Sequence, residues 1–134
     1  MRSKEGIYFL FYSSGCTRDS SYVSRPHPPT QTQRDPLTDE RQDIKYATAE
    51  HVAGPYTRAG RPLLRTGDWS LEAPGSPSVI RNADDSAYLM AFHARMQTAE
   101  GGVRAMWWSK LSLEGRHARL VNEVELNRIE MRGW

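Results

Sequence analysis

The chain has a single cysteine and no long apolar run, and each of these shortages excludes a class of protein. One cysteine can form neither an internal disulfide nor a multi-cysteine metal site. No window of the sequence approaches the ~20 consecutive apolar residues that a membrane-spanning helix needs. The excess of basic over acidic residues is also small, 18 Lys and Arg against 16 Asp and Glu in 134 residues. So scattered a charge predicts that neither nucleic acid nor a membrane is a partner.

The apolar run from Ile7 to Tyr12 follows Arg2 and Lys4 and superficially resembles the beginning of a secretory signal. The run is too short, it contains two tyrosines, Glu5 interrupts the basic region, and no small-x-small cleavage site follows. A β-strand covered on both faces is the favoured interpretation. The sequence therefore shows no signal peptide, and it assigns no compartment to the chain.

Short β-prone segments separated by turn residues predict an all-β fold. Strands are expected over residues 7–12, 43–50, 78–81, 87–94, 103–111 and 118–124, with a hairpin turn over 82–86. Two segments repeat one plan, in which an aromatic-rich strand precedes a strand of alternating polarity. The first pairs 8–12 with 44–48 and the second pairs 88–93 with 103–109. Such a repeat predicts propeller blades or stacked sheets, and hairpins of a β-sandwich are the alternative.

The segment from Val23 to Gln42 does not follow this plan. It is rich in proline and charge and almost free of apolar side chains, so a disordered insert between two strands is expected. Its removal joins Ser21-Tyr22 to Asp43 and takes out a whole number of codons. Val23-Ser24 can be encoded by GTAAGT and Gln42 by CAG, which are splice-site sequences. A translated intron over residues 23–42 is the second hypothesis, and the nucleotide sequence tests it.

The order of several short motifs resembles glycoside hydrolase family 43, which contains arabinanases, arabinofuranosidases and β-xylosidases. The residues that carry the resemblance are Gly6 to Ser13, Tyr46-Ala47-Thr48-Ala49, Gly54-Pro55-Tyr56, Pro62-Leu63-Leu64, Ala73 to Val79, Tyr88 to Ala94 and Gly102 to Met106. Each motif alone is weak, but their order and spacing together are specific. The resemblance covers nearly all of residues 1–134 outside the insert.

The resemblance implies a five-bladed β-propeller, of which the chain would hold roughly the last two blades. The family hydrolyses glycosidic bonds with inversion, using two aspartates and a glutamate acid. All three would lie upstream of Met1, so the chain is expected to be a truncated and inactive fragment of such an enzyme. The family is mostly secreted, and its substrates are arabinose- or xylose-containing plant polysaccharides. Its partner would therefore be a cell-wall polysaccharide or oligosaccharide.

No residue is assigned as catalytic. Glu72 lies in a Glu-Ala-Pro triplet and is the remaining candidate acid, but the resemblance places this triplet at the opening of the next blade. A loop carboxylate is therefore the favoured interpretation of Glu72. Asp84 and Asp85 are adjacent in a turn, where their side chains diverge, and they form no acid/base pair.

Three residues are expected to contact substrate. His93 ends a strand where the family places a channel-facing histidine that holds a metal or a water in some arabinanases. His93 is accordingly the candidate metal ligand, with calcium as the candidate ion, and a core histidine is the equally weighted alternative. Arg95 and Ser76 are the other two candidates; a solvated strand end and a hydrogen-bonded turn residue are their alternatives.

Trp107 and Trp108 are neighbours in an expected strand, so they should face opposite sides of the sheet. Packing against other blades is predicted for both, in preference to sugar stacking. A partial propeller would expose its inter-blade faces, which predicts poor solubility or self-association. A non-catalytic carbohydrate-binding β-sandwich is the alternative function.

Overall fold

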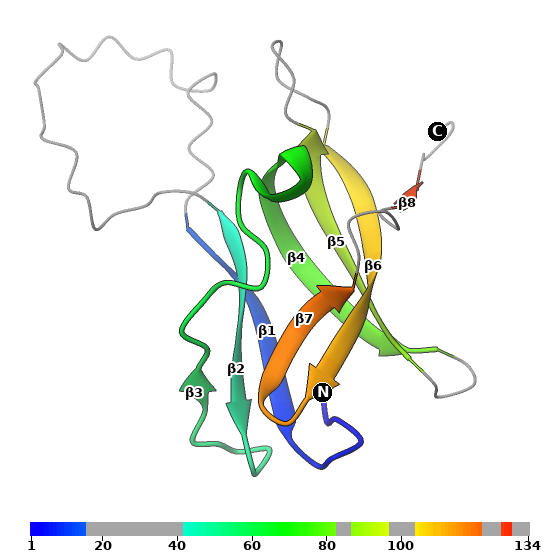
Figure 1. The fold of residues 1–134 in the computed structure, drawn as a ribbon. Coiled ribbons are helices and arrows are strands. Elements are labelled where there is room, and N and C mark those ends of the chain that lie inside the picture. Colours follow the sequence, from blue (N-terminus) through cyan, green and yellow to red (C-terminus); the bar gives the residue numbers. More distant parts are fainter. Residues whose placement is uncertain (16–41, 83–86, 97–103, 122–126, 130–134) are drawn as a thin grey trace, which may run out of the picture.

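The computed structural model describes residues 1–15, 42–82, 87–96, 104–121 and 127–129, and these form two antiparallel sheets (Figure 1). The first sheet has the order β1 (Tyr8–Ser14), β2 (Asp43–Ala49) and β3 (Thr57–Arg58). The second has the order β4 (Leu71–Arg81), β5 (Tyr88–Met96), β6 (Arg104–Glu114) and β7 (His117–Val121), and β8 (Asn127–Ile129) pairs with β6. A 3-10 turn at Asp68–Ser70 precedes β4. The all-β prediction is confirmed.

Strand β4 differs most from the prediction, because it begins at Leu71 rather than at Ser78. Pro74 and Pro77 disfavour a strand in this segment, because proline cannot donate a backbone hydrogen bond. Among the described strands, β4 pairs only with β5, so it is an edge strand, where proline is tolerated. The pairing of β4 with β5 also shifts register twice, between Glu72 and Gly75 and again between Gly75 and Ser78.

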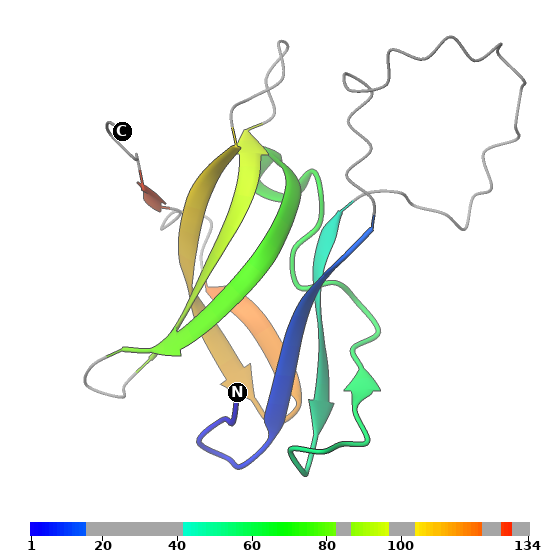
Figure 2. The same ribbon diagram turned by 180° about the vertical axis from the view of Figure 1, so that it is seen from behind.

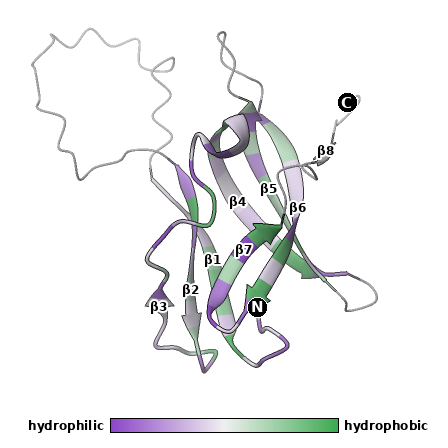
Figure 3. Ribbon diagram, viewed as in Figure 1, coloured by the Kyte–Doolittle hydropathy of each residue, from purple (hydrophilic) through white to green (hydrophobic). Residues whose placement is uncertain are grey.

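The two sheets pack on one another around a single apolar core. Strands β1 and β4 lie side by side in both views (Figures 1 and 2). Ile44 of the first sheet joins buried side chains of the second, and hydrophobic residues are interspersed with hydrophilic ones along β5 and β6 (Figure 3). The core consists of Ile44, Leu64, Leu71, Tyr88, Met90, Phe92, Ala94, Trp107 and Leu111. Each repeated unit of the sequence thus places its paired strands in one sheet, and the sheets share one core.

The outer faces of both sheets remain partly open, and one strand prediction is corrected here. Strand β1 was expected to be covered on both faces, but Phe9 is buried whereas Leu10 is 50% exposed. On the second sheet, Ile80 and Met106 are exposed on the face opposite the core. None of the helices in the described residues is long and apolar enough to cross a membrane.

Candidate functional site

The beginning of β4 carries the most irregular backbone in the described chain. Trp69, Ser70, Ala73 and Ser76 all have positive φ angles, between 48° and 57°, although none is glycine. Bulges of this kind re-aim side chains and are common beside functional sites. Non-glycine residues in the left-handed region cost about 1–3 kcal/mol each and cluster at such sites. The irregular start of β4 is therefore the first indication of a site.

Three buried polar atoms without a hydrogen-bond partner in the described structure lie around this bulge. They are Ser14 Oγ, Gln42 Oε1 and His93 Nε2. Gly75 pairs with His93 across β4 and β5, and a Cβ at Gly75 would lie 3.1 Å from His93 Nε2 and would overlap the Gln42 amide. Glycine at this position lets Gln42 and His93 approach the same stretch of backbone. Buried polar atoms without partners are costly, and each requires an explanation.

Ser76 connects the bulge to the first sheet. Its backbone N–H donates to Ser13 Oγ at 2.7 Å, while its own side chain is exposed. Ser14 pairs with Asp43, next to Gln42, at the same end of the sheet. We call this group the Gly75–His93 cluster; it consists of Ser13, Ser14, Gln42, Gly75, Ser76 and His93. It places two of the predicted substrate contacts, Ser76 and His93, in one region.

The surroundings of His93 favour the neutral form of its imidazole. Burial, and then the positive charge of Arg104, lower the pKa of His93 below its usual value. A neutral imidazole has one N–H donor and one nitrogen acceptor. At neutral pH the group can therefore accept a hydrogen bond at one nitrogen and donate at the other, as a contact to a sugar hydroxyl requires.

Arg95 and Glu72 lie opposite each other in the pairing of β5 with β4, one step beyond the cluster. Both side chains are half-buried. Arg104 lies opposite Arg95 on β6, so two cations flank this end of the sheet. The third predicted contact, Arg95, thus follows His93 on the same strand and face.

The candidate acid from the sequence, Glu72, lies in β4 and is separated from Gly75 by a shift in the register of the pairing with β5. The other carboxylates of the described residues each accept a hydrogen bond within the protein: Glu5 from Gly115, Glu50 from Arg116, Glu114 from Ser112, Asp43 from Thr66 and Asp68 from Arg65. Asp84 and Asp85 lie outside the described residues. The geometry thus adds nothing in favour of a catalytic role for Glu72.

The surroundings of His93 do not fit a calcium ion. In the part of the chain that the structure describes, no group of three or more His, Cys, Asp or Glu side chains could hold a metal. Calcium prefers six to eight oxygen ligands, and the positive charge of Arg104 acts on this site. Beside the imidazole nitrogen, the cluster offers the neutral oxygens of Ser14 and Gln42 and no carboxylate, which is a poor match for calcium.

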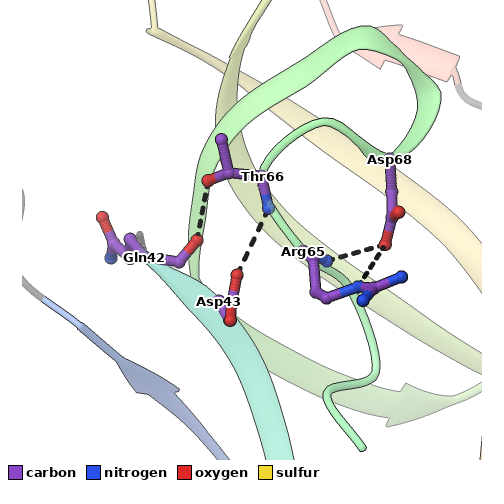
Figure 4. Close-up of polar contacts among 5 residues, drawn as sticks. All are labelled: Gln42, Asp43, Arg65, Thr66 and Asp68. Atoms are coloured by element: carbon purple, nitrogen blue, oxygen red, sulfur yellow. Dashed lines mark hydrogen bonds and ion pairs between the residues drawn. The ribbon is translucent and has the colours of Figure 1, made fainter. Parts of the chain in front are cut away.

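Thr66 bonds to Gln42 of the cluster and to the neighbouring Asp43 (Figure 4). Its hydroxyl donates to the Gln42 carbonyl at 3.0 Å and accepts the Ala73 backbone N–H at 3.1 Å. Its own N–H donates to Asp43 Oδ1 at 3.3 Å. One side chain thereby joins the beginning of β2 to the beginning of β4, close to the bulge. Asp68 closes the same loop by accepting the Arg65 N–H at 2.8 Å.

Replacing Thr66 by valine is expected to destabilise the protein by about 1–3 kcal/mol, because Ala73 N–H and the Gln42 carbonyl lose the hydroxyl between them. Valine keeps the shape of threonine, so the loss isolates the hydrogen bonds. The measurement is urea unfolding of both proteins. Thr57→Val on the exposed strand β3 is the control and should change the free energy of unfolding by less than about 0.5 kcal/mol. Equal losses in the two variants would contradict this role of Thr66.

Comparison with known proteins identifies the class of fold. No family model matches the sequence, and a search of curated proteins also finds no match. Among solved structures, the chain is similar to one described as the crystal structure of a thermostable family-43 glycoside hydrolase, with a TM-score of 0.62 and 22% identity. The similarity covers 90% of this chain and 33% of that one. The described chain therefore has an all-β, glycoside-hydrolase-like fold and spans about a third of the length of the similar enzyme.

The sequence predicted two of the six residues of the Gly75–His93 cluster, Ser76 and His93, as contacts and missed the other four. Ser13 and Ser14 were interpreted as the end of a strand, and Gln42 was assigned to the insert. Of residues 23–42 only Gln42 is described, so the disorder and intron hypotheses fall outside the described residues. One signal for the site was present: a glycine between prolines, at the opening of a strand, marks a place where another group approaches the backbone.

Proposed function

We propose that this chain is part of a glycoside hydrolase propeller and that the Gly75–His93 cluster contributes to its sugar-binding surface. The observation that carries the proposal is the set of buried, unpartnered polar atoms of Ser14, Gln42 and His93 beside a strained strand. Sugar hydroxyls both donate and accept hydrogen bonds. A ligand of this chemistry can therefore satisfy an amide oxygen, a serine hydroxyl and a neutral imidazole together.

The proposed substrates are arabinose- or xylose-containing plant polysaccharides. Support comes from the fold similarity to a family-43 glycoside hydrolase together with the sequence motifs that resemble that family. Ser76 and Arg95 flank the cluster and supply further polar contacts. An inverting hydrolase needs an acid and a base on opposite sides of the scissile bond. Among the described residues Glu72 is the one candidate acid, and no candidate base is assigned beside it. We therefore expect the isolated chain to bind sugar without hydrolysing it.

The test is isothermal titration of the chain with arabino- and xylo-oligosaccharides, together with an assay for released reducing sugar. His93→Ala should weaken binding about tenfold or more, because it removes a buried hydrogen-bonding group. His51→Ala, in the exposed loop after β2, is the matched control and should leave binding unchanged. Equal affinities of the wild type and His93→Ala would refute the site. Stoichiometric hydrolysis by the purified chain would refute the assignment as a non-catalytic part.

A non-catalytic carbohydrate-binding β-sandwich is the second candidate. The observation in its favour is that the two sheets already enclose one shared core. Such a module would be complete in itself and would bind arabinan as a monodisperse monomer. Sedimentation of the sugar-bound chain distinguishes the two candidates, because an incomplete propeller is expected to associate.

A further inference from the structure

A groove on the side of the molecule is lined by cations and lacks acidic side chains. It has a volume of about 520 Å³ and lies between β2 and β3 on one side and the beginning of β7 on the other. Arg58 and Arg61 line one wall, and Arg116 and His117 line the other. The chain as a whole carries nearly equal numbers of basic and acidic residues. Glu50 outside the lining pairs with Arg116, so the local positive charge of the groove comes from Arg58 and Arg61.

The walls of this basic groove are held in place by specific contacts. Ala118 N–H donates to the Tyr46 hydroxyl at 3.2 Å, which fixes β7 against β2. Arg116 donates to Glu50 at 2.6 Å, which attaches the turn between β6 and β7 to the end of β2. On the other wall, Ala59 N–H donates to the Tyr46 carbonyl at 3.0 Å. The groove is thus part of the folded architecture.

Arg58 and Arg61 are exposed and form no ion pair with another described residue, whereas the groove's third arginine, Arg116, pairs with Glu50. Hydrophilic colour marks β3 and the turn between β6 and β7 (Figure 3). A guanidinium group presents a planar fork of N–H donors that matches a carboxylate. Two guanidinium groups available in one concave site favour an anionic ligand.

The remaining lining is suited to a sugar ring. Tyr46 and Thr48 lie largely buried on the same face of β2, and the exposed Thr57 lies opposite Thr48 on β3. Aromatic and hydroxyl groups of this kind are the usual contacts of small polar ligands in pockets of roughly 300–1,000 Å³. A second hollow of about 420 Å³ shares the segment 58–62 and extends past Lys45 to Ser13 and Ser14 of the Gly75–His93 cluster.

We propose that the basic groove binds an acidic oligosaccharide, whose uronic acid carboxylate is held by Arg58 and Arg61. Two hollows with shared walls suit an elongated ligand that runs toward the Gly75–His93 cluster. The choice of a sugar acid over another carboxylate rests on the proposed function. The groove itself rests on different residues, so the two proposals can fail separately.

The test compares a glucuronic-acid-substituted xylo-oligosaccharide with the neutral oligosaccharide of the same length by isothermal titration. The acidic ligand should bind about tenfold or more tightly than the neutral one, and added salt should reduce the difference. The double variant Arg58→Gln/Arg61→Gln should abolish the preference. Arg65→Gln/Arg119→Gln removes the same charge from two exposed arginines outside the groove and should preserve it.

Three results would overturn the proposal. The first is equal affinity for the acidic and neutral sugars. The second is an equal loss in both double variants, which would mean that net charge alone attracts the ligand. The third is inorganic phosphate competing as strongly as the acidic sugar, which would assign the groove to phosphate ligands. Binding of neutral sugar that depends on His93 while acidic binding fails would leave the proposed function standing and reject the groove.

Discussion

Replacing Ile44 by alanine is expected to lower the free energy of unfolding by about 2–5 kcal/mol. Ile44 is fully buried, with 0% exposure, and is the member of the apolar core that β2 contributes. Its backbone N–H donates to the Leu64 carbonyl at 2.9 Å, so the strand is fixed and cannot collapse into the space. The variant therefore loses the transfer free energy of the removed carbons and also leaves a cavity.

Ile80→Ala is the matched control, because it removes the same atoms from a side chain that is 60% exposed. We expect a change of less than about 1 kcal/mol there, since little apolar area leaves water at this position. Urea unfolding followed by tryptophan fluorescence measures both. If the two variants lost similar stability, the core between the sheets would not be what holds the chain together. We also expect the two sheets of Ile44→Ala to unfold together in one cooperative transition.

The strands that the sequence predicted best are those whose signal is local. Continuous β-prone runs located β1, β2 and β5 to within about two residues. Alternation along β6 also predicted correctly that Trp107 and Trp108 face opposite sides: Trp107 is buried in the core, whereas Trp108 lines a hollow on the other face. Trp107 thus packs in the core, and packing against other blades stays a prediction for both tryptophans.

The beginning of β4 could not be predicted, because the signals there conflict. Prolines at 74 and 77 and a glycine at 75 are typical of a loop, and only an edge position with bulges makes them acceptable in a strand. Edge position depends on the order of strands in the sheet, which is a non-local property. Strand β3 has two residues and β8 has three, and both are too short to show alternation.

The candidate site was predicted only in part, for the same reason. His93 was located from its place in a strand, but its neighbours come from other elements. Gln42 approaches Gly75, and Ser14 pairs with Asp43, the residue after Gln42, although these residues are far apart in the sequence. The basic groove shows the same limit, since Arg58 lies in β3 and Arg116 in the turn between β6 and β7, far apart in the sequence. The composition of the whole chain gives only the net charge and does not show where the arginines gather. It therefore did not point to an anionic ligand.

Self-association of the purified chain is the second result with a large expected effect. The outer face of the second sheet carries a shallow apolar hollow of about 240 Å³, lined by Ser78, Ile80, Leu89, Ala91 and Trp108. Met106, 41% exposed, also lies on this side of β6. A contiguous apolar surface of this kind drives association in water. Sedimentation velocity over a range of concentrations should therefore show a reversible increase in mass.

The double variant Ile80→Lys/Leu89→Lys should weaken this association by about tenfold to a hundredfold, because burying each side chain contributes roughly 1.5–3 kcal/mol. Two charges on the same face would also repel their copies in the partner chain. Val52→Lys is the control: Val52 is more exposed, at 70%, but it lies in the loop between β2 and β3, away from the sheet face. Its association constant should stay at the wild-type value.

The outcome also separates the two proposed functions, because they differ in what this face is for. In a larger propeller an apolar outer face is a surface on which another sheet packs, so association of the isolated chain follows directly. In a self-contained sandwich no further sheet covers this face, so its apolar side chains would stay exposed to water. A chain that stayed monomeric at every concentration would contradict the association prediction and favour the sandwich. Association abolished by Ile80→Lys/Leu89→Lys and preserved in Val52→Lys would favour the propeller.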